Sequence, residues 1–217
     1  MSRILIAGLV IALLAGCSEP LALVGVKGSG KLVSQSYQYS GFTKIDAGNS
    51  AQVEVARGDT YSVNVEVDDN LVDRLEVSVN GDTLHIGLKS GAYRNETLRA
   101  QVTMPKLTGV TLSGASTLTG QLAGEDLEAD LSGASRATLT GTAGKETIEA
   151  SGASQALLGG LVAGGDVKVN ASGASRIEIN TSGAVTGEAS GGATVVVSGP
   201  AASVNVQASG GAQVNTK

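Results

Sequence analysis

Apolar and polar residues alternate over much of the chain between residues 41 and 106. In AQVEVARGDTYSVNVEV (51–67), valines recur at every second position on both sides of Gly58-Asp59, and their neighbours are polar. A period of two is typical of strands that bury one face. The segment therefore predicts two half-buried strands joined by a turn at Gly58-Asp59.

Shorter signals predict three further elements in this part of the chain. We expect a first strand near residues 31–39. The segment DDNLVDRL (68–75) interrupts the alternation, which predicts a single helical turn capped by Asp69 or Asn70. The segment LEVSVNGDTLHIGL (75–88) alternates again around Asn80-Gly81, a pair that strongly predicts a β-hairpin. We expect the strands of residues 41–106 to form further coils of the fold described next, or a cap on it.

The second half of the chain repeats one short motif. Ser-Gly-Ala-Ser occurs four times, and Ser-Gly-Gly-Ala follows twice. The glycines of these Ser-Gly pairs are Gly114, Gly133, Gly152, Gly173, Gly191 and Gly210, so the steps are 19, 19, 21, 18 and 19 residues. A regular step of this size is typical of a solenoid.

Inward and outward positions can be assigned within each repeat. The fourth residue after the glycine is always apolar and the third is always polar. The apolar set is Leu118, Ala137, Ala156, Ile177, Val195 and Val214, and the polar set is Thr117, Arg136, Gln155, Arg176, Thr194 and Gln213. A similar alternation precedes the glycine, so each repeat contains at least two short strands that meet at Ser-Gly. The pattern predicts an all-β fold, a single-stranded parallel β-helix with about 19 residues per coil and about 4.8 Å between coils.

The small residues of the motif fit the corner of such a coil. A larger side chain would meet its own copy in the coils above and below, and glycine adopts backbone angles that other residues avoid. The serine hydroxyls can bond along the stack or to corner backbone groups. We therefore interpret Ser113, Ser132, Ser151, Ser172, Ser190 and Ser209 as structural, because nucleophilic serines need an adjacent base and none is evident in the sequence.

The N-terminal segment has the features of a secretory signal. Arg3 precedes an apolar run from Ile4 to Leu14, which is too short to span a membrane as a helix. The sequence Leu-Ala-Gly-Cys that ends at Cys17 resembles the bacterial lipobox, which implies lipidation of Cys17 with a diacylglycerol. In lipoproteins of this kind an Asp directly after the Cys favours retention in the inner membrane. The residue here is Ser18, which implies the outer membrane instead. We expect a lipoprotein signal peptide over 1–16, a lipid-anchored tether over 17–34 and a β-helical domain over 35–217, with repeat coils over 107–217.

Composition and charge exclude several classes of function. The net charge is −5, which disfavours a nucleic-acid partner. Cys17 is the only cysteine, so no internal disulfide is possible. Trp is absent and Phe occurs once, so we expect a narrow core of Val, Leu, Ile and Ala. The glycine-rich segment 25–31 fits part of a phosphate-binding loop, but Leu32 stands where Ser or Thr is required and no helix follows. We predict no cofactor and no metal site.

Two sets of side chains carry the remaining chemical possibilities. His85, the only histidine, lies on a predicted strand and is interpreted as a solvent-facing residue without a catalytic partner. Asp130, Glu149 and Glu188 share one outward column, with Arg136 and Arg176 on another face. We interpret the acidic column as a solvated face and predict no catalytic residues. The alternative is a protein that binds or processes polysaccharide with these carboxylates.

Several segments together resemble a known family. They are GFTKIDAGNSAQVEV, DDNLVDRLEV, GDTLHI, VTMPKLTGVTLSGAS and the repeated Ser-Gly-Ala-Ser, and their order over residues 35–212 is similar to that of the bacterial head GIN domain, an auto-transporter adhesin domain. The resemblance implies a right-handed parallel β-helix similar to pectin lyases, without recognised catalytic residues, and a role in cell-surface adhesion.

These observations converge on one expected function. The sequence predicts a non-enzymatic cell-envelope lipoprotein that presents a β-helical surface for adhesion or assembly. It contacts the membrane through Cys17 and a protein or glycan partner through its surface. The last predicted coil would expose unpaired backbone groups, so we expect it to pair with a second copy of the chain or with a partner.

Overall fold

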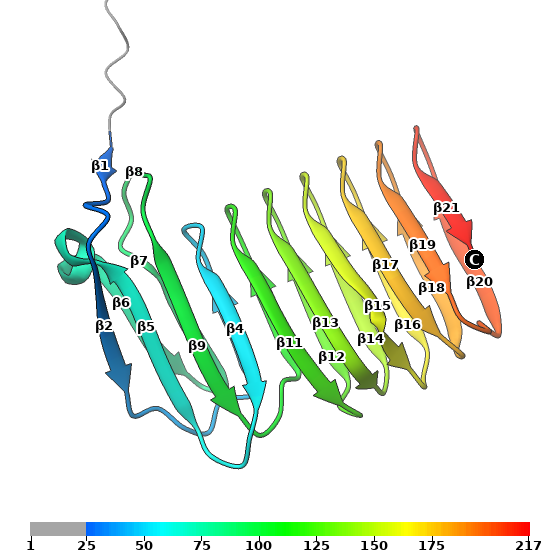
Figure 1. Cartoon of the computed structure of the whole chain (residues 1–217). Helices are drawn as coiled ribbons and strands as arrows, with labels where there is room; N and C mark the ends of the chain where they lie inside the picture. The colour runs from blue at the N-terminus through cyan, green and yellow to red at the C-terminus, as the bar shows by residue number, and fades with distance from the viewer. Residues whose placement is uncertain (1–24) are drawn as a thin grey trace, which may run out of the picture.

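Two long sheets lie face to face and together form a solenoid (Figure 1). The computed structural model describes residues 25–217. The nine-stranded sheet has the order β20 (Ser203–Ala208), β18 (Ala184–Ala189), β16 (Val167–Ala171), β14 (Glu146–Ala150), β12 (Leu127–Leu131), β10 (Gly109–Leu112), β3 (Lys44–Ala47), β7 (Thr83–Leu88) and β6 (Leu75–Asn80). The ten-stranded sheet has the order β2 (Leu32–Tyr37), β5 (Ser62–Asp68), β9 (Leu98–Met104), β4 (Gln52–Arg57), β11 (Thr117–Ala123), β13 (Arg136–Ala143), β15 (Gln155–Ala163), β17 (Arg176–Thr181), β19 (Thr194–Ser198) and β21 (Gln213–Thr216).

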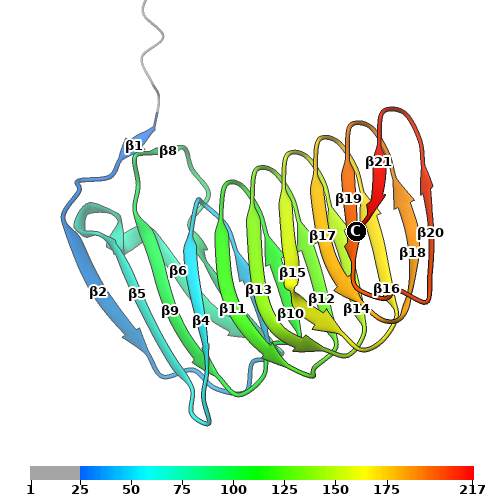
Figure 2. The same cartoon turned by 45° about the vertical axis from the view of Figure 1, so that its right-hand side comes forward.

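The predicted stack of parallel coils is confirmed. From β10 onward each coil places one strand in each sheet, and successive coils pair in parallel (Figure 2). Equivalent repeat positions are directly opposite one another, as in the pairs Ala129↔Ile148 and Leu118↔Ala137. The inward columns are buried except in the last coil, where Val206 and Val214 are half-buried, and the outward columns lie on the two outer faces. The β-helix inferred from the 19-residue step is therefore the fold of the protein.

The glycines of the motif form a backbone ladder at the corner between the sheets. The amide that follows each glycine donates to the carbonyl of the glycine one coil earlier, as in Ala153 N to Gly133 O at 2.7 Å and Ala174 N to Gly152 O at 2.7 Å. Each of these glycines has φ near +70°, in the left-handed region. A Cβ built on Gly152 would lie 2.6 Å from Gly133 O. Both the backbone angle and the close approach of the coils therefore require glycine.

The two serines of the motif have different environments. The second serine is buried in Ser116, Ser135, Ser154 and Ser175. Ser154 Oγ donates to Leu131 O at 3.1 Å, which is a backbone carbonyl of the preceding coil. The first serine of each motif is more exposed, and Ser151, Ser172 and Ser190 line the groove described below. The repeat pattern predicts the hydroxyl ladder at the first serine, whereas the buried hydroxyls are those of the second.

Residues 25–106 provide one further coil and a cap. Strands β3 and β4 pair in register with β10 and β11, so they form a coil of the same stack. Its corner uses Asn49 and Ser50, with φ of 56° and 58°, in place of the glycine. The hairpin predicted at Asn80-Gly81 is confirmed by the antiparallel pair β6–β7. The two valine-rich strands β4 and β5 are also present, but β9 lies between them in the sheet.

The outermost elements close the N-terminal end of the core. The short strand β1 (Val26–Lys27) pairs with β8 (Tyr93–Arg94), and β2 adds antiparallel to β5. The stacked rings of Tyr37 and Tyr39 pack against the core, and the Tyr39 hydroxyl donates to Val77 O on β6. The predicted helical turn is the 3-10 helix η1 (Asp69–Arg74). Its N-cap is Asp68 and not Asp69 or Asn70. The Asp68 carboxylate does not cap the helix and instead accepts hydrogen bonds from Gly30 N and Thr97 N.

The glycine ladder predicts a position-specific loss of stability. We expect Gly152→Ala to lower the free energy of unfolding by about 3 kcal/mol, because the new Cβ meets the left-handed backbone penalty and the Gly133 carbonyl. Gly164→Ala is the matched control, since its Cβ would meet nothing closer than 3.8 Å. Denaturant unfolding of both variants measures the difference. Equal midpoints would show that the corner tolerates a side chain.

Candidate functional site

The outer face of the nine-stranded sheet carries an open groove lined by three parallel rows of side chains. The central row is Asp130, Glu149, Asn170, Glu188 and Gln207, which are consecutive partners in the sheet register. Lys168, Thr186 and Asn205 form one flanking row, and Ser151, Ser172 and Ser190 form the other. The groove has a volume of about 660 Å³. We call it the ladder groove.

The predicted acidic column is therefore assembled, but with amides among the carboxylates. Asn170 lies between Glu149 and Glu188, and its Nδ2 donates to Glu149 Oε1 at 3.2 Å. Partial burial raises the pKa of Asp130, and the neighbouring charges of Glu149, Glu128 and Asp46 raise it further. The row consequently offers both acceptors and donors along the solenoid axis.

The two arginines considered together with the acidic column lie on the other sheet. Arg136 and Arg176 project from β13 and β17 on the opposite sheet, so the core separates them from the acidic row. Arg176 forms an ion pair with Glu178 on its own strand, with Nη2 to Oε1 at 2.6 Å. The arrangement does not bring guanidinium groups to the carboxylates of the ladder groove.

His85 has a partner that the sequence analysis did not identify. It lies on β7 directly opposite Asp46 of β3, and the distance from His85 Nδ1 to Asp46 Oδ2 is 2.9 Å. The His85 side chain is 40% exposed, so the predicted solvent-facing position is correct. Asp46 is 39 residues earlier in the chain, and only the register of the coils brings the pair together.

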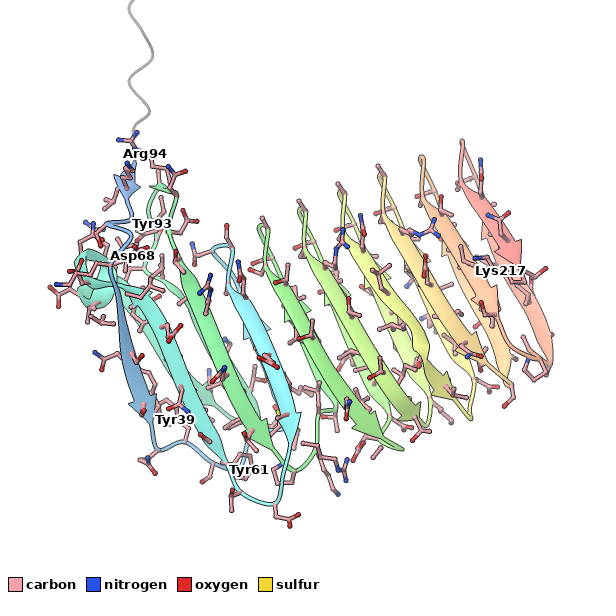
Figure 3. The ribbon with its side chains drawn as sticks, in the orientation of Figure 1. Tyr39, Tyr61, Asp68, Tyr93, Arg94 and Lys217 are labelled. Carbon is pink, nitrogen blue, oxygen red and sulfur yellow. The ribbon has the colours of Figure 1, made fainter. Side chains whose placement is uncertain are left out.

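The glycine-rich segment that resembles a phosphate-binding loop is occupied by the chain itself. Ser29 N donates to Asn70 Oδ1 at 3.0 Å, and Gly30 N donates to Asp68 Oδ1 at 2.6 Å. Thr97 N donates to the other Asp68 oxygen at 2.7 Å, and Asp68 is fully buried. Asp68, Tyr93 and Arg94 are labelled in Figure 3, all at the N-terminal end of the stack. Amides that would bind a phosphate in a nucleotide site are thus used to attach the N-terminal segment.

Two other predictions concern the anchor and metal binding. Cys17 lies outside residues 25–217, so its lipidation stays a prediction. Within the described residues, no helix has the length and apolar character needed to cross a membrane. The same part of the chain contains no group of three or more His, Cys, Asp or Glu residues arranged to hold a metal ion.

Comparisons with known proteins agree with this architecture. The family model described as "Putative auto-transporter adhesin, head GIN domain" matches residues 41–201. Among curated proteins, none matches the chain in sequence. A crystal structure of a putative adhesin from Bacteroides fragilis has a TM-score of 0.72 and 20% identity, covering 89% of this chain and 100% of that one.

Two further crystal structures have a lower similarity. A putative adhesin from Parabacteroides merdae has a TM-score of 0.54 and 16% identity, over 89% of this chain and 99% of that one. A putative lipid binding protein from Parabacteroides distasonis has a TM-score of 0.51 and 15% identity, over 88% of this chain and 99% of that one. At these identities the likeness shows a shared fold.

One carboxyl group lies inside the core, and sequence reasoning missed it. Glu146 begins β14 at an inward position, between Leu127 and Val167 of the neighbouring coils. It is 1% exposed, and neither carboxylate oxygen has a hydrogen-bond partner. Burial raises the pKa of Glu146 to about 7. A glutamate beside a polar turn gives no signal in the sequence that distinguishes it from the exposed Glu149.

The buried carboxyl group predicts a pH-dependent stability. The folded-state pKa of Glu146 is raised from 4.5 to about 7. Between these pH values the unfolded chain loses its Glu146 proton while the folded chain keeps it, so the free energy of unfolding falls as the pH rises from 4.5 to about 7. The shift corresponds to about 3 kcal/mol. We expect the advantage of Glu146→Gln over the wild type to grow by that amount between these pH values. The exposed Glu149→Gln is the control, and a constant difference for Glu146→Gln in denaturant unfolding at both pH values would contradict the assignment.

Proposed function

We propose a function from the premise that this chain belongs to the head GIN domain family, whose model covers residues 41–201. The protein is a non-enzymatic cell-envelope lipoprotein whose solenoid presents a surface for adhesion or for assembly with another envelope component. The surface in question is the ladder groove, and the anchor is Cys17.

The observation that carries this proposal is the regular array of the ladder groove. Its central row extends from β12 to β20, four strand steps or about 19 Å along the axis. The coils beneath it are held by the glycine ladder, so the side chains project from a rigid base. A preorganised surface loses little conformational entropy on binding, which favours recognition of an extended partner.

The charge of the groove restricts the kind of partner. Asp130, Glu149 and Glu188 contribute three carboxylates, whereas Lys168 is the basic residue that lines the groove. This excess of negative charge repels polyanions and attracts basic surfaces. A protein surface with exposed amides, hydroxyls or lysines complements the row.

The direction of the chain supports an anchored arrangement. Strand β1 lies at the N-terminal end of the stack (Figure 1), and Lys217 lies at the opposite end (Figure 3). An anchor at Cys17 would hold the capped end near the membrane and direct the ladder groove, which lies in the C-terminal coils, away from it. We further propose, as a separate contact, that the exposed strands β20 and β21 pair with a second copy or with the partner.

One observation favours a second candidate, a polysaccharide-processing activity in the same groove. Asp130 has a raised pKa and lies next to Glu149, and two adjacent carboxyl groups can act as general acid and base. The adhesive function is preferred because the Glu149 carboxylate already accepts the Asn170 amide and the groove lacks aromatic residues for sugar stacking.

The ladder groove can be tested with a triple variant. We expect the 18–217 fragment, which contains every strand, to bind one or more immobilised matrix or envelope proteins, and Asp130→Asn/Glu149→Gln/Glu188→Gln to weaken that binding about tenfold. Arg136→Gln on the opposite sheet is the matched control. Equal loss in the control would remove the groove from the proposal, and release of soluble product from polysaccharide, abolished by Glu149→Gln alone, would assign the enzyme instead.

The anchor can be tested separately. We expect Cys17→Ser to move the protein from the membrane fraction to the soluble fraction, because the lipid would have no attachment site. Immunoblots of fractionated cells measure the change, and protease digestion of intact cells reports whether the wild-type domain faces outward. Retention of the Cys17→Ser protein in the membrane fraction would contradict lipid anchoring.

A further inference from the structure

A second polar groove lies on the other sheet, near the N-terminal end of the stack. It crosses strands β2, β5, β9, β4 and β11, which lie side by side in Figure 1, and has a volume of about 530 Å³. One row of its side chains consists of Ser34, Glu66, Arg99, Gln52 and Thr117, which are consecutive register partners. The parallel row consists of Asn64, Gln101, Glu54 and Thr119. We call this surface the Arg99 groove.

The charged groups of the Arg99 groove are not used within the described chain. Among residues 25–217, Arg99, Glu54 and Glu66 form no ion pair within 4.0 Å. All three side chains are exposed. Arg99 lies directly opposite Glu66, and Glu54 lies on the adjacent strand β4 in the parallel row, so the groove offers unpaired donors and acceptors side by side.

The rows form a polar array with one dominant direction. Five strands at a spacing of about 4.8 Å give the groove a length of about 19 Å along the solenoid axis. Towards the C-terminus the second row changes character, since Leu157 and Val196 occupy its positions in β15 and β19. The first row stays polar beyond Thr117, with Arg136 and Gln155 next in register, but the groove itself is confined to the five strands at the N-terminal end.

The composition of the groove excludes several kinds of ligand. Two carboxylates against one guanidinium disfavour nucleic acid and other polyanions. The groove lies on the face of the sheet and not at an edge, so it cannot add a peptide strand by backbone pairing. Its lining includes Val53 and Ala100 but no large apolar side chain that would form a pocket for a hydrophobic anchor.

A neutral chain of hydroxyl groups satisfies this array. Each sugar hydroxyl is both a donor and an acceptor, so it can donate to Glu54 or Glu66 and accept from Arg99, while amides such as Gln52 serve either role. We propose that the Arg99 groove binds an extended neutral oligosaccharide that lies along the solenoid axis. This site lies on the other sheet from the ladder groove and does not require the anchor at Cys17. A test of this proposal is therefore separate from the tests of the proposed function.

The absence of aromatic residues from the groove lining determines the strength of this binding. Stacking on aromatic rings supplies much of the affinity of sugar sites, and the lining provides hydrogen bonds alone. We expect weak binding by one copy and stronger retention when many anchored copies face the same polysaccharide.

The test is an NMR titration of the ¹⁵N-labelled 18–217 fragment with cellohexaose, maltohexaose and mannohexaose, and with hexagalacturonate as the charged probe. We expect at least one neutral probe to shift the amides of Gln52, Arg99 and Gln101 at millimolar concentration, with an affinity that changes less than about twofold at high salt. Arg99→Ala and Glu66→Ala should each weaken binding about tenfold. Arg136→Ala, in the same row but outside the groove, and Glu188→Gln on the opposite sheet should leave it unchanged.

Defined results would overturn the assignment. The proposal fails if none of the three neutral probes shifts these amides at millimolar concentration, or if the Arg99→Ala and Glu66→Ala fragments bind as tightly as the wild type. Tighter, salt-sensitive binding of hexagalacturonate would assign an anionic glycan held by Arg99 instead. Each variant alters an exposed side chain, so we expect its unfolding midpoint to equal that of the wild type. Measuring that midpoint verifies that the variant is folded.

Discussion

The approach of one coil to the next at the corner glycines is the constraint on which the structure depends. The amide after each glycine reaches the glycine carbonyl of the preceding coil at 2.7 Å, and a Cβ at the same place would lie within about 3 Å of that carbonyl in most coils. No side chain fits between them. Because the Ser-Gly corners from Gly114 to Gly210 close in the same way, the strands on both sides of them are held in register.

This register determines which side chains line the ladder groove. Side chains that are about 19 residues apart become neighbours, so a polar position in the repeat becomes a row along the axis. The ladder groove is a row of this kind, whereas the rows of the Arg99 groove, on the opposite face, join residues of non-repeating strands. They differ in charge because one contains three carboxylates and one lysine, whereas the other combines Glu54 and Glu66 with an unpaired arginine.

The departures from regularity have identifiable local causes. The 21-residue step is absorbed by β15, where the register shifts around Leu157–Val162 and Gly159-Gly160 are exposed. At the N-terminal end, the tyrosines and β2 cover the core, and Asp68 attaches the glycine-rich loop. Glu146 is a different case, because its burial opposes stability at neutral pH and no partner compensates it.

The sequence alone determined the fold class, the period of the coils, the hairpin at Asn80-Gly81 and the row of Asp130, Glu149 and Glu188, because each depends on a local period or on a repeated glycine. It did not determine the contact of His85 with Asp46, the position of β9 between β4 and β5, the capture of the Gly25–Lys31 loop by Asp68, or the burial of Glu146. The Arg99 groove was not determined by the sequence either, since its nine polar residues come from five strands in the order β2, β5, β9, β4 and β11.

Repeat spacing specifies which residues stack only where the chain repeats. In residues 25–106 the pairing crosses non-repeating segments, so only the tertiary structure decides which side chains meet.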